Sequence, residues 1–92
     1  MLDIVKHALR ISSDDFNMEI IHLIDSAKSD LKLSGVVNVD DDDPLIKRAI
    51  ITYCKANFGW DNPEAERFAK SYDMLKAHLA LSQEYTTAGD GT

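Results

Sequence analysis

Apolar residues recur at three- and four-residue spacing in four stretches of this chain, and polar residues or glycine separate the stretches. This spacing is typical of α-helices that bury one face. It predicts a short helix over residues 2–10 and longer helices over about 14–33, 44–58 and 63–83. The pattern therefore predicts an all-α fold, a small bundle of one short and three longer helices.

The third stretch carries signals for both ends of its helix. The Asp43 side chain can accept a hydrogen bond from the first turn, and Pro44 fits the first helical position, where no N–H is needed. Gly59 is predicted to stop the helix, because a residue without Cβ adopts the left-handed conformation at low cost. Apolar residues cover more than one face of this helix, so we expect it to be central and to contact several neighbours.

The chain has 92 residues, which is enough for one small domain. We place that domain at residues 1–85 and expect residues 86–92, which have no large packing side chain, to form a disordered C-terminal tail. A chain of this size buries only about 60–65% of its unfolded surface, so association that buries more apolar surface would stabilise it.

Charge is unevenly distributed along the chain, whose net charge is −6. Asp40, Asp41, Asp42 and Asp43 form an uninterrupted acidic run, whereas residues 44–59 carry three basic residues and no acidic one. A general nucleic-acid-binding protein needs a basic face to displace counterions from phosphates, and this balance argues against that class. It suits a protein that docks charged patches onto other proteins.

The acidic run has part of the spacing of a calcium-binding EF-hand loop, with Asn38, Asp40 and Asp42 at alternating positions. The glycine that such a loop requires at its sixth position is Asp43 here, and its twelfth-position glutamate is Ala49. We therefore expect no calcium site. Two interpretations stay open: a solvated loop that ends in a helix cap, and an acidic patch for a basic partner.

The basic residues Lys47, Arg48 and Lys55 are predicted to lie along the central helix. They form either an ordinary solvent-exposed face or a basic stripe that meets an acidic patch, such as the acidic run of another copy. Surfaces of opposite sign at different places on one subunit permit head-to-tail association, which closes into a ring if the rotation allows. Trp60 is either a lid on the core or an interface anchor.

No residues have the spacing of a catalytic, metal or cofactor site. Glu19 and His22 form one Glu-x-x-His pair, but a di-iron bundle needs a second such pair. His7, His78 and Cys54 lie on separate segments without zinc-ligand spacing. A thiol inside an apolar helix is inert unless its pKa is lowered, so we expect Cys54 to be a core residue, no cofactor, and no enzymatic activity.

Nothing in the sequence predicts insertion into a membrane. No apolar run approaches the ~18–20 residues of a spanning helix, and the N-terminus lacks the pattern of a signal peptide. A single cysteine also fits a reducing compartment. We expect the protein to be made in the cytoplasm.

The order of these elements resembles the small head–tail connector (adaptor) proteins of tailed bacteriophages, which are also known as phage DNA-packaging proteins. The resemblance covers roughly residues 1–85 and is one of ordered pattern rather than of a catalytic signature. The segments that carry it are Met1–Ile11, Asp14-Asp15, Leu23–Lys28, Asp43–Ile50, Tyr53–Lys55, Phe58-Gly59 and the leucines Leu75, Leu79 and Leu81.

The resemblance implies an all-helical subunit that assembles as a ring of about a dozen copies at the head–tail junction of the virion. Such a ring would lie beneath the portal protein and present a surface to a head-closure or tail protein. DNA would pass through its lumen without sequence-specific binding. The protein would be made in the cytoplasm of the host bacterium.

Two other classes of protein compete with this interpretation. A small cytoplasmic regulatory or nucleic-acid-binding helical domain would use Lys47, Arg48 and Lys55 on a recognition-type helix. An enzyme would need a site built on Cys54 or on a metal, for which the sequence offers no ligand or triad spacing.

Overall fold

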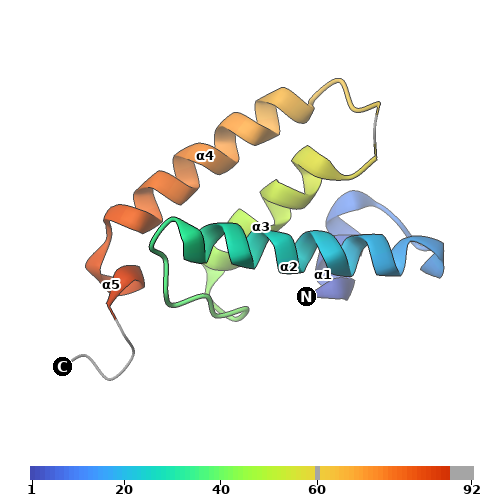
Figure 1. Ribbon diagram of the computed structural model, residues 1–92. Helices are drawn as coiled ribbons and strands as arrows, with labels where there is room; N and C mark the ends of the chain where they lie inside the picture. Colours follow the sequence, from blue (N-terminus) through green and yellow to red (C-terminus); the bar gives the residue numbers. More distant parts are fainter. Residues whose placement is uncertain (60, 88–92) are drawn as a thin grey trace.

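A computed structural model describes residues 1–59 and 61–87 and confirms the all-α fold (Figure 1). Three helices of 14 to 17 residues and one of eight residues form the body, and no strand occurs in the described ranges. Two short helical segments complete the fold. In chain order the elements are α1 (Leu2–Leu9), the 3₁₀ turn η1 (Asp14–Phe16), α2 (Asn17–Leu33), α3 (Pro44–Asn57), α4 (Ala65–Leu81) and α5 (Gln83–Thr86).

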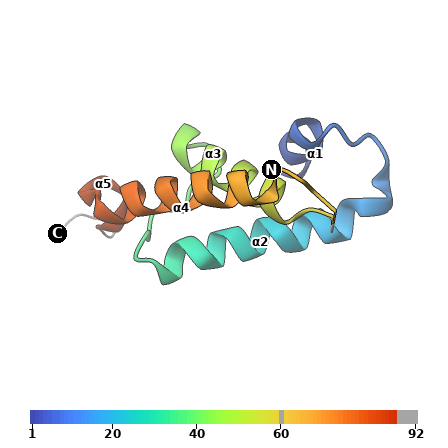
Figure 2. The same ribbon diagram turned by 90° about the horizontal axis from the view of Figure 1, so that it is seen from above.

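Helix α3 is the centre of the bundle, as its apolar character predicts. Helices α2 and α4 both pack extensively against it, and α1 contacts α2 and α3 at the other end of the molecule from α5 (Figures 1 and 2). Both views show α2 running beside α3. Helix α5 follows α4 after a sharp bend.

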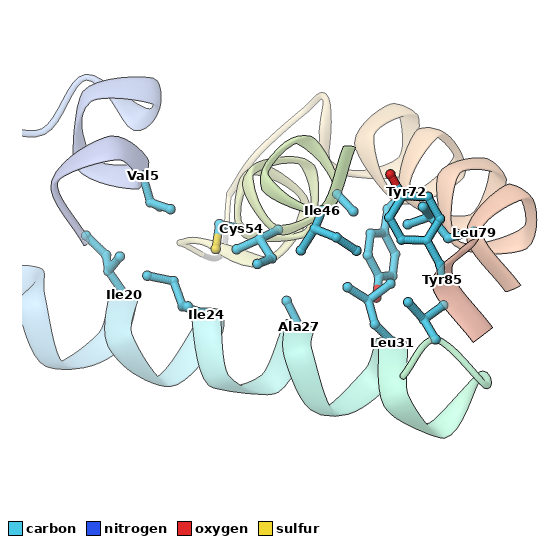
Figure 3. Packing of buried hydrophobic residues seen from close by; sticks show 13 residues of the cluster. Val5, Ile20, Ile24, Ala27, Leu31, Ile46, Cys54, Tyr72, Leu79 and Tyr85 are labelled. Carbon is cyan, nitrogen blue, oxygen red and sulfur yellow. The ribbon is translucent and has the colours of Figure 1, made fainter. Parts of the chain in front are cut away.

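The hydrophobic core lies mainly between α2 and α3 and extends toward α4 and α5 (Figure 3). Each of the two long contacting helices contributes residues at helical spacing, and most of these are completely buried. Side chains from the other segments close the two ends of the core. Its members are Val5, Ile20, Ile24, Ala27, Leu31, Val36, Ile46, Ala49, Ile50, Cys54, Tyr72, Leu79 and Tyr85.

The predicted start of the central helix is confirmed, and the helix ends one residue earlier than predicted. Asp43 Oδ1 accepts hydrogen bonds from the N–H groups of Leu45 (2.8 Å) and Ile46 (3.2 Å). The helix ends at Asn57, whose side chain donates to the Tyr53 carbonyl at 2.9 Å and satisfies one of the terminal acceptors. The chain then leaves the helix before Gly59, which adopts a left-handed φ of 75° in the following turn.

The second and fourth predicted helices also begin later than expected. The side chain of Ser13 accepts a bond from the Asp15 N–H (3.0 Å), and the chain makes the turn η1 before α2. At the start of α4, the side chain of Asn62 accepts from the Glu64 N–H (2.9 Å) and donates to the Lys55 carbonyl (2.8 Å). This double contact holds a non-helical turn, so α4 begins at Ala65 rather than at Pro63.

The C-terminal region contains a helix that the sequence pattern did not predict. The fourth helix stops at Leu81, and α5 continues to Thr86, the first residue of the expected tail. Residues 88–92 of that tail, and Trp60, lie outside the described residues. The division into a domain of residues 1–85 and a tail of residues 86–92 therefore stays a prediction.

Candidate interaction surfaces

The acidic run forms a loop between α2 and α3, and the fold itself uses part of it. Asp41 makes an ion pair with Lys28 of α2, at 2.8 Å between carboxylate and ammonium. Asp40 accepts a hydrogen bond from the N–H of Asp42 (3.0 Å), and both of these side chains are exposed. The solvated loop with a helix cap is thus present, and Asp40 and Asp42 are the carboxylates that remain accessible to a partner.

Asp43 joins the start of α3 to the C-terminal helix α5. In addition to capping α3, its carboxylate accepts hydrogen bonds from the Tyr85 hydroxyl at 3.0 Å and 2.9 Å. Burial would raise the pKa of the Asp43 carboxyl, but the bonds from Tyr85 and from the N–H groups of Ile46 and Leu45 outweigh it and hold that pKa below its usual value. Burial, followed by the bond to Asp43, raises the pKa of Tyr85 to about 12.

Backbone and side-chain bonds attach α5 to the segment before the acidic run. The Tyr85 carbonyl accepts from the N–H groups of Val37 (2.8 Å) and Asn38 (3.1 Å). The Asn38 side chain donates to the carbonyls of Glu84 (2.7 Å) and Thr87 (2.9 Å). Periodicity could not reveal this clamp, because it joins two irregular segments; the one sequence signal is a lone aromatic residue, Tyr85, in an otherwise polar terminus.

The predicted basic stripe lines an open groove of about 820 Å³ between α3 and α4. Lys47, Arg48 and Lys55 all contribute to it from α3, and His78 contributes from α4. None of the described residues that line it is acidic. The apolar part of the lining comes from both helices and consists of Pro44, Leu45, Ile51, Phe68, Met74 and Leu75.

The cations of this groove are not neutralised within the described part of the chain. None of Lys47, Arg48 and Lys55 makes an ion pair there, whereas Lys6, Lys28, Arg67, Lys70 and Lys76 each do. The Lys55 ammonium lies 5.5 Å from the centre of the Phe68 ring, over its face. Lys55 also borders a second hollow, of about 490 Å³, which His7 and Arg10 line from the side of α1.

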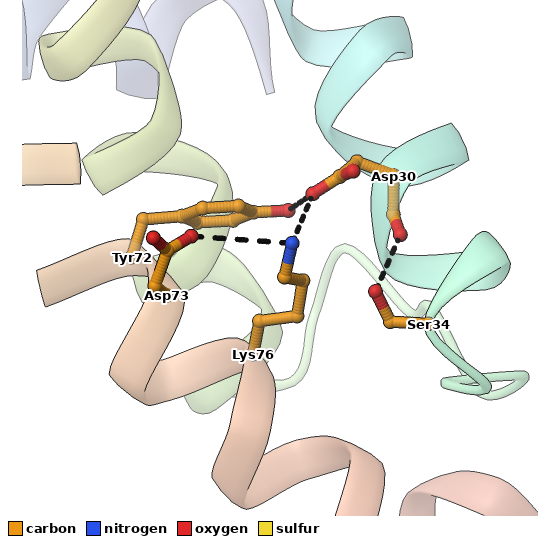
Figure 4. A network of polar contacts seen from close by, with 5 residues as sticks. All are labelled: Asp30, Ser34, Tyr72, Asp73 and Lys76. Atoms are coloured by element: carbon orange, nitrogen blue, oxygen red, sulfur yellow. Dashed lines mark hydrogen bonds and ion pairs between the residues drawn. The ribbon is translucent and has the colours of Figure 1, made fainter. Parts of the chain in front are cut away.

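A polar network ties α2 to α4 beside the core (Figure 4). The Asp30 carboxylate accepts from the Tyr72 hydroxyl (2.7 Å) and pairs with the Lys76 ammonium (3.0 Å). Burial would raise the pKa of the Asp30 carboxyl, but these bonds outweigh it and lower that pKa, whereas burial and the bond to Asp30 raise the pKa of Tyr72. The Tyr72 ring also packs edge-on against Tyr53 of α3, with centroids 5.1 Å apart.

The candidate catalytic and metal-binding residues do not form a common site in the described part of the chain. Cys54 is completely buried, and burial raises the pKa of its thiol to about 12, so the nucleophilic thiolate is strongly disfavoured. Within residues 1–59 and 61–87, no three His, Cys, Asp or Glu side chains are grouped as ligands for a metal ion. No helix of the described chain is long and apolar enough to cross a membrane.

Comparison with known proteins places the chain in a family. Searches of curated proteins and of solved structures find no match. The family described as "Phage connector protein" matches residues 1–86, which is nearly the whole chain and includes the groove, the acidic loop and α5. The match agrees with the resemblance that the ordered helical pattern indicates. The chain therefore belongs to the phage connector protein family.

Proposed function

We propose that this protein is a structural subunit of the virion that assembles as a ring beneath the portal protein and joins the DNA-filled head to a head-closure or tail protein. Membership of the connector family supports this role in general. The specific observation that supports the ring is a groove with exposed apolar side chains and with cations that make no ion pair to the described residues, on a small subunit with a net charge of −6. Such a surface suits protein–protein contact.

The two charged surfaces take different roles in this proposal. The groove with Lys47, Arg48 and Lys55 faces a neighbouring subunit, and the exposed Asp40 and Asp42 of the acidic loop meet a basic partner surface. Asp41 and Asp43 shape the loop through Lys28 and Tyr85. Trp60, which follows α3 in sequence, is proposed as a further interface residue.

The subunit has no enzymatic role in this proposal, and it binds no cofactor. The single thiol, Cys54, is buried within the core, where it packs as a small apolar side chain. A negative subunit does not grip phosphate, so DNA passes through the lumen of the ring without sequence-specific binding.

The test is the mass of the purified protein over a concentration series, measured by light scattering, with electron micrographs of the heaviest fraction. We expect closed rings of about a dozen subunits, either alone or on portal rings added as a template. A chain that stays monomeric at every concentration and does not bind portal rings would contradict the proposal.

The competing function is a nucleic-acid-binding domain, and one observation favours it. The cations of the groove continue past Lys55 to Arg10, which gives a longer basic track than the three residues of α3 alone. A titration with duplex DNA at two salt concentrations decides between the two functions. Binding whose affinity falls steeply with salt would favour nucleic-acid recognition, and weak binding at both concentrations would favour the connector.

A further inference from the structure

The groove between α3 and α4 has an open apolar floor as well as charge. Leu45 is 47% exposed and Met74 is 65% exposed, although both are large apolar residues. Ile51 and Leu75 also line the groove. Duplex DNA would pair with the cations but would leave these apolar side chains uncovered. The groove therefore fits a protein surface that combines carboxylates with exposed apolar side chains.

The outward side of α2 is a surface of that kind. Helix α2 buries Ile20, Ile24, Ala27 and Leu31 against the core, and a rotation of about 100° per residue places its other side in solvent. In the first half of the helix that side carries Met18, which is 80% exposed, and Ile21, which is 40% exposed. Asp25 is exposed beside them, and Glu19 is exposed about 100° around the helix from Met18, on the flank away from Ile21. Neither carboxylate makes an ion pair in the described part of the chain.

The two surfaces lie on opposite sides of the subunit. Helix α3 turns Ile46 and Cys54 toward α2 (Figure 3). Arg48 and Lys55, which line the groove, lie about half a turn around the helix from Ile46. Figures 1 and 2 show α2 and α3 as neighbouring layers, so the outward side of α2 faces away from the groove. Two different, complementary surfaces placed in this way join copies head to tail, the arrangement from which rings are built.

We propose that the α3–α4 groove binds a second copy of this chain, through the face of α2 that carries Met18, Glu19, Ile21 and Asp25. This inference rests on the proposed function, because it names the contact from which the ring is made. Arg48 and Lys55 pair with Glu19 and Asp25 of the neighbouring copy, and Met18 and Ile21 cover Leu45, Ile51 and Met74. His22 lies within the same face of α2, and His78 borders the groove.

The acidic loop is the other candidate occupant of the groove, and the structure favours α2 over it. Asp41 is paired with Lys28, and Asp43 is engaged by Tyr85 and the start of α3. The loop therefore offers two exposed carboxylates, Asp40 and Asp42, and among residues 34–43 a single large apolar side chain that is exposed, Val37 at 49%, which is less apolar contact than α2 provides. Apolar contact in the middle of an interface, with charged pairs around it, is the usual composition of a stable contact.

Charge reversal tests the contact in the full-length chain. Arg48→Glu/Lys55→Glu and Glu19→Lys/Asp25→Lys should each move the midpoint of assembly to a concentration about tenfold higher or more, measured by light scattering. Combining all four substitutions in one chain should restore assembly, as should mixing the two double variants, which then alternate. This restoration also shows that the variants fold. Glu66→Lys/Asp73→Lys, which makes the same charge change on a side of α4 away from the groove, should leave the midpoint unchanged.

The outcomes separate this inference from the proposed function. Rings that form equally well with either double variant would overturn the α2 contact and leave the proposed ring in place. Loss of rings with Asp40→Lys/Asp42→Lys, while Glu19→Lys/Asp25→Lys has no effect, would assign the groove to the acidic loop and overturn the inference. If assembly requires portal rings, the same variants are compared on them. Failure of the natural chain to assemble under either condition would overturn both proposals.

Discussion

The two sides of helix α3 differ in charge and in what covers them. On one side Ile46, Ala49, Ile50 and Cys54 belong to the core that α3 shares with α2 and other segments, and they have no exposed surface. On the other side Arg48, Ile51 and Lys55 line an open groove beside α4. Both sides carry apolar residues, but Arg48 and Lys55 on the open side also carry charge that no ion pair within residues 1–59 and 61–87 neutralises.

This difference separates residues needed for folding from residues available for binding. Burial of apolar surface within the chain stabilises the fold, and a charge on that side would have to leave water without compensation. Arg48, by contrast, keeps its charged group in solvent, and Ile51 is only partly covered. We therefore expect substitutions on the covered side to lower the free energy of unfolding, and substitutions on the open side to weaken assembly instead.

The largest expected effect on stability comes from replacing one of two neighbouring isoleucines of α3 with alanine. Ile50→Ala should reduce the free energy of unfolding by about 3 kcal/mol, because it removes a fully buried side chain and leaves a cavity. Ile51→Ala should cost less than about 1 kcal/mol, since part of that side chain is already in water. Urea denaturation of the monomer, followed by circular dichroism, measures both values.

One outcome of these two substitutions would contradict the distinction between the two sides of α3. Equal destabilisation by Ile50→Ala and Ile51→Ala would mean that the groove is as important to the fold as the covered side. The distinction between the two sides of α3 would then be lost.

The next largest effect is expected where the acidic loop meets α3. Asp43→Ala should reduce the free energy of unfolding by about 2 kcal/mol, because it removes a helix cap and leaves the buried Tyr85 hydroxyl without its acceptor. Asp42→Ala is the matched control in the same loop, and its exposed side chain predicts a change within about 0.5 kcal/mol. A large loss in both variants would indicate that repulsion within the run, rather than the cap, governs this region.

A smaller effect, which depends on pH, is expected for the network between α2 and α4. At neutral pH, Asp30→Asn should cost about 1 kcal/mol, because Asn keeps a hydrogen-bond acceptor for Tyr72 but loses the charge that Lys76 requires. The pKa of Asp30 is lowered in the fold, so its contribution is present above the unfolded value of about 3.9 and is lost as the pH falls through the folded value.

The measurement is the free energy of unfolding of both proteins at several pH values from neutral to strongly acidic. The difference between the natural chain and Asp30→Asn should shrink as the solution becomes acidic. A difference that stays constant down to acidic pH would show that the charge of Asp30 does not contribute to the free energy of unfolding through the network between α2 and α4.

The sequence was sufficient to predict the four main helices, although not the short helix α5, because the signals of a long helix are local. The spacing of apolar residues located all four main helices, and Asp43 with Pro44 marked the start of α3. The basic stripe was also predicted, although the groove that contains it was not, since Phe68, Met74 and Leu75 come from another helix. The contacts of Tyr85 and Asp30 join residues about 40 positions apart, and helical periodicity does not report such pairs.

The smallest expected effect on stability is that of Arg48→Ala, and it sharpens the comparison of the two sides of α3. The Arg48 side chain is exposed and makes no ion pair within the described chain, so the free energy of unfolding should change by less than about 0.5 kcal/mol. The concentration at which the chain assembles should nevertheless rise, because the groove loses a cation that faces the neighbouring subunit. Lys70→Ala, on the outer side of α4, is the control and should alter neither quantity. A variant that is stable but assembles poorly would show that residues for binding and residues for folding can be near neighbours in one helix, because one side of that helix faces the core and the other side faces an open groove.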